Sequence, residues 1–154
     1  MMERAPPRAL MKLLFVCTGN VCRSLMAERL ALDLARRRGL PLEARSCGVA
    51  AEGWYRVPAE AWAALKEAGV AESPHRARLA ERALLAWADS VLVMTARQRE
   101  VLRDQFPEHR AKIALLREAA GLSGEVADPI GKPLATFRSC RDSLQEALER
   151  LLPP

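Results

Sequence analysis

Short apolar segments alternate along the chain with longer segments in which apolar residues recur at helical spacing. Four of the short segments are typical of strands buried in a sheet: residues 11–16, 44–49, 90–94 and 112–116. Helices are predicted at residues 24–38, 58–68, 79–88, 96–106 and 136–152. This alternation predicts an α/β fold, a single domain with a four-stranded parallel sheet flanked by helices.

The end of the first predicted strand is the expected position of a binding site. Parallel sheets bind ligands at the carboxyl ends of their strands, often against the N-terminus of the following helix. The first strand leads into Cys17, and the first helix begins at Ser24. We therefore expect the chemistry of this protein in the loop between them.

The length of the chain fits one domain. It has 154 residues, of which 50% are hydrophobic, enough for one core. We expect a domain over residues 11–154, preceded by a flexible N-terminal extension of residues 1–10. No apolar run approaches the roughly 20 residues of a membrane helix, and the start lacks the features of a secretory signal. The sequence predicts a cytoplasmic protein that has no membrane partner.

The charge of the chain is positive but dispersed. The formal net charge is +5, and the only run of basic residues, at 36–38, lies at the predicted C-terminal end of a helix, where cations complement the helix dipole. We therefore expect no nucleic-acid partner, and a surface that attracts anionic substrates. The sequence leaves the oligomeric state open.

The cysteines and histidines do not form a metal-binding pattern. Four cysteines and two histidines are present, without a Cys-x-x-Cys pair or a Cys/His set at zinc spacing. A disulfide framework is not expected in a cytosolic chain with a full core. Cys47 and Cys140 fit small packing residues, whereas Cys17 and Cys22 stand in the loop after the first strand.

This loop has the composition of an anion cradle. Gly19 and Asn20 are the residue types that most readily adopt left-handed backbone angles, which turn successive N–H groups inward. The following helix adds its free N–H groups, and Arg23 can hold two oxygens of a bound anion. The whole segment reads Cys17, Thr18, Gly19, Asn20, Val21, Cys22, Arg23 and Ser24. It is the predicted phosphate loop between the first strand and the first helix.

Cys17 stands beneath the cradle as a candidate nucleophile. A helix N-terminus and nearby cations favour a thiolate, and the Ser24 hydroxyl can donate to it. Such a thiolate can attack phosphorus in line, while backbone N–H groups and Arg23 stabilise the equatorial oxygens. The competing phosphate-binding motif, G-x-x-x-x-G-K-[ST], is absent.

The segment C-T-G-N-V-C-R-S resembles the signature of the low-molecular-weight protein tyrosine phosphatase family, which includes the bacterial protein arginine phosphatases. The resemblance extends over residues 11–152. It implies that Cys17 forms a phosphocysteine intermediate, that Arg23 binds the phosphoryl group, and that no metal or other cofactor is required. It also implies a phosphorylated protein or peptide as substrate, and binding of phosphate or other oxyanions.

Three further matches follow from this resemblance. Asp128-Pro129 matches the family's late Asp-Pro pair, whose carboxyl protonates the leaving group and then activates water. Ser46 and His75 match positions that hydrogen-bond the phosphate loop through its asparagine, here Asn20. Cys22 matches a second loop cysteine that can form a disulfide with the nucleophile and protect it from over-oxidation.

The sequence is divided on the substrate. Tyrosine-directed members have aromatics after Asp-Pro and usually isoleucine at the position of Val21, whereas arginine phosphatases have D-P-F-G-G and threonine. Here Ile130 and Gly131 follow Asp-Pro, and Trp54 and Tyr55 are candidates for the cleft wall.

We predict hydrolysis of phosphotyrosine, an aryl phosphate, because a valine cannot pair with the N–H of phosphoarginine. Phosphoarginine is the alternative. An arsenate reductase is a weaker alternative, because such an enzyme needs a further pair of cysteines near the middle of the chain to pass electrons. No cysteine lies between Cys47 and Cys140.

Overall fold

A computed structural model describes residues 8–154 and contains one four-stranded sheet. The strands are β1 (Met11–Cys17), β2 (Leu42–Gly48), β3 (Ser90–Val93) and β4 (Ile113–Leu115). They are all parallel, in the order β2-β1-β3-β4. The predicted fold class is confirmed.

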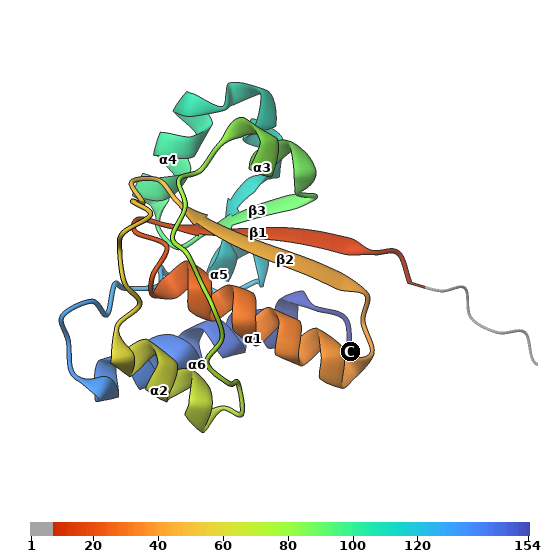
Figure 1. Ribbon diagram of the computed structural model, residues 1–154. Coiled ribbons are helices and arrows are strands. Elements are labelled where there is room, and N and C mark those ends of the chain that lie inside the picture. Colours follow the sequence, from red (N-terminus) through yellow and green to blue (C-terminus); the bar gives the residue numbers. More distant parts are fainter. Residues whose placement is uncertain (1–7) are drawn as a thin grey trace, which may run out of the picture.

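Helices cover both faces of the sheet (Figure 1). On one face lie α1 (Arg23–Arg38), α2 (Ala59–Glu67) and α6 (Leu134–Leu151), and on the other lie α3 (Arg82–Trp87) and α4 (Ala96–Gln105). Alternate residues of β1 face opposite sides. Phe15 and Cys17 therefore pack into the core beneath α1, whereas Leu14 and Val16 pack with α3 and α4.

The structure differs from the sequence prediction before α3. A helix was expected over residues 79–88, but α3 begins only at Arg82. Residues 78–80 instead extend the pairing at the end of β2, where Gly48 donates to the Arg78 carbonyl and Ala80 donates to the Gly48 carbonyl. Backbone pairing with a strand end therefore overrides the helical spacing of the side chains.

The second difference lies around β4. Pro107–Lys112 forms a 3₁₀ helix, η1, and a short helix, α5 (Leu116–Ala119), begins directly after the strand. The predicted strand over 112–116 is therefore three residues long. Proline is favoured in the first turn of a helix. Pro107, which follows the helix expected over residues 96–106, therefore also begins η1.

The described part of the chain begins just before β1. Residues 8–10 are exposed and have no regular structure, whereas residues 1–7 of the predicted extension lie outside the described residues. Within 8–154, no helix combines the length and the apolar character needed to cross a bilayer.

Candidate active site

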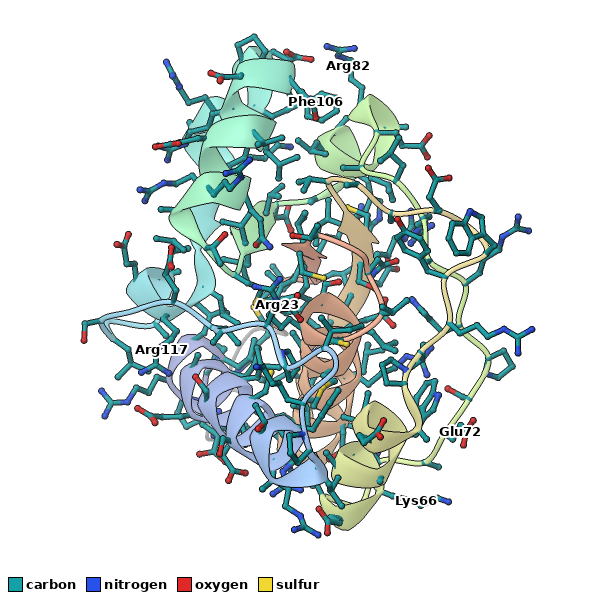
Figure 2. The ribbon with its side chains drawn as sticks, turned by 90° about the vertical axis from the view of Figure 1, so that its left-hand side faces the viewer. Arg23, Lys66, Glu72, Arg82, Phe106 and Arg117 are labelled. Carbon is teal, nitrogen blue, oxygen red and sulfur yellow. The ribbon has the colours of Figure 1, made fainter. Side chains whose placement is uncertain are left out.

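The phosphate loop lies at the carboxyl edge of the sheet. β1 ends at Cys17, residues 18–22 form the loop, and α1 begins at Arg23. In the sheet, β2 lies on one side of β1 and β3 lies on the other. The strand order therefore reverses at β1, and the carboxyl edge at this point is a topological switch point. Figure 2 faces the same edge and places the labelled Arg23 near the centre of the view.

A cavity of about 340 Å³ opens over the loop. It is lined by Cys17, Thr18, Gly19, Val21, Cys22, Arg23, Trp54, Tyr55, Arg56, Asp128 and Ile130. The fold thus brings together residues from the loop, from the segment after β2 and from the segment before α6. Arg56 was not a sequence candidate, and no motif distinguishes it from the other dispersed arginines.

The loop is held in a strained conformation by Asn20. This residue has a φ of 60°, and within residues 8–154 it is the only non-glycine residue with a positive φ. Its Nδ2 donates to Ser24 Oγ at 2.9 Å, and its Oδ1 accepts from the Arg78 backbone N–H at 3.1 Å. Its carbonyl oxygen accepts from His75 Nε2 at 2.7 Å. These contacts offset the backbone strain of about 1–3 kcal/mol.

Ser46 does not contact the loop as expected. Its hydroxyl donates to Glu28 Oε1 at 2.9 Å, and its carbonyl accepts from Arg78 Nε at 3.1 Å. Because the backbone N–H of Arg78 bonds to Asn20, Ser46 reaches the loop through Arg78 rather than directly. The predicted Ser46–Asn20 hydrogen bond is not among those of the described residues, because the Ser46 hydroxyl donates to Glu28 of α1 instead.

Hydrogen bonds converge on the sulfur of Cys17. Ser24 Oγ lies 2.9 Å from Cys17 Sγ, and the Asn20 backbone N–H donates to the same sulfur at 3.3 Å. Ser24 Oγ already accepts from the Asn20 amide, so its own proton is available to point at the sulfur. The sulfur therefore faces two hydrogen-bond donors at the N-terminus of α1.

The guanidinium of Arg23 has an unused edge. Its Nη1 donates to the Val126 carbonyl at 3.0 Å, and its Nη2 lies 3.6 Å from Asp128 Oδ2. Its Nε is buried and has no hydrogen-bond partner among the described residues. The Nε and Nη2 groups therefore form a fork that two oxygens of a phosphoryl group can fill.

Asp128 lines the same cavity as the loop, beside the Arg23 guanidinium. Its side chain is 45% exposed, and its Oδ1 accepts from the Ile130 backbone N–H at 3.1 Å. The segment that carries it is fixed to the sheet, because the Val126 N–H donates to the Met94 carbonyl. A half-exposed carboxyl at this position can exchange protons with a leaving group or with water.

The other three cysteines differ from Cys17 in their surroundings. Burial, with a further contribution from the Asp128 carboxylate, raises the pKa of Cys22 to about 12. Burial likewise raises the pKa values of Cys47 and Cys140 to about 12. These three thiols therefore stay protonated at neutral pH.

Aromatic side chains form one wall of the cavity. The rings of Trp54 and Tyr55 meet edge to face, with centroids 4.7 Å apart, and a Cβ added at Gly19 would lie 3.6 Å from the Tyr55 ring. Trp54 is 76% exposed and Ile130 is 49% exposed. The described residues contain no group of three or more histidine, cysteine, aspartate or glutamate side chains that could hold a metal ion.

Comparison with known proteins agrees with this geometry. The model of the family described as low molecular weight phosphotyrosine protein phosphatase matches residues 12–153. A protein-arginine-phosphatase of Bacillus subtilis (strain 168) is 39% identical over 142 residues, which are 92% of this chain and 94% of that protein.

Two solved structures show the same fold. The crystal structure of a low molecular weight protein tyrosine phosphatase from T. tengcongensis has a TM-score of 0.88 and 39% identity, covering 92% of this chain and 97% of that one. The YwlE arginine phosphatase, as a mutant with a phosphorylated active-site serine, has a TM-score of 0.88 and 37% identity, covering 92% and 93%.

Proposed function

The chain belongs to the low molecular weight phosphotyrosine protein phosphatase family, and we propose that it hydrolyses phosphotyrosine through a phosphocysteine intermediate without a metal ion. Members of this family are cysteine-dependent hydrolases, and their substrates are phosphorylated proteins.

In the first step the Cys17 thiolate attacks phosphorus. An S–P bond forms as the bond from phosphorus to the phenolic oxygen breaks, and Asp128 in its acid form gives its proton to that oxygen. Arg23 and the loop N–H groups stabilise the charge on the three equatorial oxygens.

In the second step water attacks the phosphocysteine. Asp128, now a carboxylate, accepts a proton from the water, and the S–P bond breaks to release phosphate and the Cys17 thiolate. Ser24, which lies 2.9 Å from the sulfur, stabilises this leaving thiolate.

The observation that carries the proposal is the unused edge of Arg23. A buried Nε without a partner is unfavourable unless a ligand completes it. Arg23 lines the same cavity as Cys17 and Asp128, so a phosphoryl group held there by the guanidinium also meets the nucleophile and the acid.

The walls of the cavity favour an aryl group over a guanidinium. Val21, Tyr55 and Ile130 offer apolar surface, and the cation of Arg56 lines the same cavity. A guanidinium carrying positive charge would be repelled by Arg56, whereas a phenyl ring can pack against Tyr55.

Phosphoarginine is the second candidate, favoured by the 39% identity to a protein-arginine-phosphatase. The comparison that decides between the candidates is kcat/KM for one peptide carrying phosphotyrosine and for the same peptide carrying phosphoarginine. A higher value for phosphoarginine would overturn the aryl assignment.

The test of the reaction itself is turnover of p-nitrophenyl phosphate by wild type and by Cys17→Ser. The variant should lose turnover while vanadate still binds, because the cradle consists of backbone N–H groups and Arg23. Residual turnover within tenfold of wild type would refute the proposed nucleophile. Arsenate, offered with a thiol reductant in parallel, should not be reduced to arsenite.

We also propose that residues 11–154 form one domain and that the protein acts in the cytoplasm without nucleic acid. The four cysteines are unpaired, which fits a reducing compartment. The basic residues are dispersed along the sequence, unlike the clustered cations of a nucleic-acid surface.

A further inference from the structure

A buried glutamine connects helix α4 to the phosphate loop. Gln98 is 3% exposed, and its amide makes hydrogen bonds through both of its ends. Its Oε1 accepts from the backbone N–H groups of Met94 at 3.0 Å and Thr95 at 3.1 Å. Its Nε2 donates to Thr18 Oγ1, in the phosphate loop, at 3.1 Å.

The same corner of the fold, residues 94–98, holds the segment that carries Asp128. The Met94 carbonyl accepts from the Val126 N–H at 3.0 Å. The Ala96 N–H donates to a carboxylate oxygen of Glu125 at 2.6 Å. The two segments that the proposed reaction needs are therefore attached to one short stretch of chain, which runs from the end of β3 into the first turn of α4.

Thr18 is held from two sides. Its carbonyl accepts from the Ala50 N–H at 3.0 Å, and its hydroxyl accepts from Gln98. Thr18 directly follows the nucleophile Cys17, so a shift of Thr18 moves the start of the phosphate loop. Glycine is required opposite it, since a Cβ at Gly48 would lie 2.3 Å from the Thr18 carbonyl oxygen.

We propose that Gln98 is a positioning residue that sets the distance between the phosphate loop and the Asp128 segment. It acts through Thr18 on one side and through the backbone of Met94 and Thr95 on the other. This inference rests on the proposed function, in which Cys17 and Asp128 act on opposite sides of one phosphoryl group.

A capping role alone does not account for Gln98. The residue completes a capping box, because its N–H donates to Thr95 Oγ1 and its side chain accepts from the Thr95 N–H. Such a box uses only the side-chain oxygen. The bond from Nε2 to Thr18 is additional, and because both ends of the amide are engaged, the orientation of the side chain is fixed.

The variant Gln98→Met tests the proposal, because it keeps the length of the side chain and removes all three amide contacts. We measure kcat/KM for a series of aryl phosphates whose leaving groups differ in basicity. The variant should lose about tenfold overall, equivalent to about 1.4 kcal/mol. The loss should be larger for basic leaving groups, which depend most on a correctly placed Asp128.

A double-mutant cycle with Thr18→Val isolates the bond between the two side chains. Thr18→Val removes the acceptor without changing the shape of the side chain, and it leaves the capping box intact. The double variant should be no worse than Gln98→Met alone. Additive losses would overturn the proposal, as would a Gln98→Met variant with the same leaving-group dependence as wild type.

Two controls separate positioning from helix stability. Thr95→Ala removes the cap acceptor and should lower Tm without changing the dependence on the leaving group. Gln105→Met makes the same chemical change at the exposed end of α4 and should match wild type. If Gln98→Met fails to fold, Thr18→Val decides alone, and an unchanged kcat/KM series in that variant refutes the inference.

Failure of this inference is distinguishable from failure of the proposed function. A wild-type protein that does not turn over aryl phosphates, or a Cys17→Ser variant that does, refutes the function and this inference with it. A wild type that is active and a Gln98→Met variant that equals it refute this inference alone.

Discussion

Nη2 of Arg23 lies 3.6 Å from Oδ2 of Asp128, so the proposed phosphate-binding cation and the proposed proton donor face each other in the free protein. The Arg23 side chain is 5% exposed and that of Asp128 is 45% exposed. A phosphoryl group seated on the guanidinium would compete with the carboxylate for it. Substrate binding would then release Asp128 from Arg23 and leave it facing the leaving group.

Asp128→Asn should therefore slow the reaction in a way that depends on the leaving group. Loss of a general acid typically costs about 10²–10⁴-fold. Substrates with a basic leaving group should lose most, because a departing oxygen of low basicity needs no proton. The measurement is kcat/KM across aryl phosphates, and an equal loss for every leaving group would remove Asp128 from the role of acid.

Gly48→Ala should destabilise the protein and damage the site together. The added Cβ would lie 2.3 Å from the Thr18 carbonyl oxygen and 2.9 Å from the Cβ of Ala51, and neither belongs to a flexible side chain. Overpacking of this kind typically costs about 1–3 kcal/mol. Thermal unfolding and p-nitrophenyl phosphate turnover should both fall.

Gly53→Ala is the matched control for this prediction. The three atoms nearest to its added Cβ all belong to the end of the Arg76 side chain, the first at 3.0 Å, and that end can move away. A Gly48→Ala variant as stable and active as Gly53→Ala would show that the Thr18 segment is free to shift.

The residues that carry the local chemistry could be predicted from the sequence. Cys17, Arg23 and Ser24 form a continuous segment between a strand and a helix, so their proximity follows from local structure alone. The left-handed φ of Asn20 follows from the intrinsic preference of asparagine.

Gln98, Arg78 and Arg56 could not be found in the same way. Gln98 lies 80 positions from Thr18, and an N3 glutamine in a helix is ordinary in sequence. Arg78 acts through its backbone N–H, which every residue except proline possesses. A side-chain bond between distant residues and a bond from a backbone N–H both depend on which chain segments the fold brings together. The periodicity of the sequence does not contain this information.

His75 should make stability depend on pH. Burial lowers the pKa of His75, and this effect exceeds the opposite one of its bond to the Asn20 carbonyl. Below the ordinary histidine pKa of about 6.5, the unfolded chain therefore binds more protons than the folded protein, so stability falls as the pH falls.

Urea unfolding at pH 7 and pH 5 measures this contribution. Wild type should lose more stability between the two pH values than His75→Gln, a variant that keeps an N–H donor near Asn20 but does not titrate. Equal losses in the two proteins would show that His75 does not contribute to the pH dependence.

Mild peroxide should oxidise Cys17 first. Peroxide reacts with thiolates, and pKa values of about 12 keep Cys22, Cys47 and Cys140 protonated. The Cys17 sulfenic acid should condense with the Cys22 thiol and release water, giving a disulfide that dithiothreitol reverses. Cys22→Ser should make the inactivation irreversible. Peptide mass spectrometry that finds Cys17 joined to Cys47 instead would contradict this prediction.

Val21 should bias the choice between the two substrates. It lines the cavity beside Gly19, with its Cγ2 3.7 Å from the position of an added Cβ there. We expect its side chain to face the atom that joins phosphorus to the substrate. Phosphoarginine presents an N–H at that atom, and a valine methyl leaves it unpaired, at a cost of about 1–3 kcal/mol. That is a preference of roughly tenfold to a hundredfold for the aryl phosphate.

Val21→Thr and Val21→Ile test this preference in opposite directions. The threonine hydroxyl can pair with the N–H, so Val21→Thr should shift the ratio of the two kcat/KM values towards phosphoarginine. Isoleucine adds apolar surface for a ring edge, so Val21→Ile should shift the ratio towards phosphotyrosine. Because each value is compared with another from the same variant, a general loss of activity cancels.

If neither substitution moves the ratio by more than about twofold, which is about 0.4 kcal/mol, Val21 only packs the loop. The choice of substrate would then depend on Trp54, Tyr55 and Ile130 at the rim of the cavity.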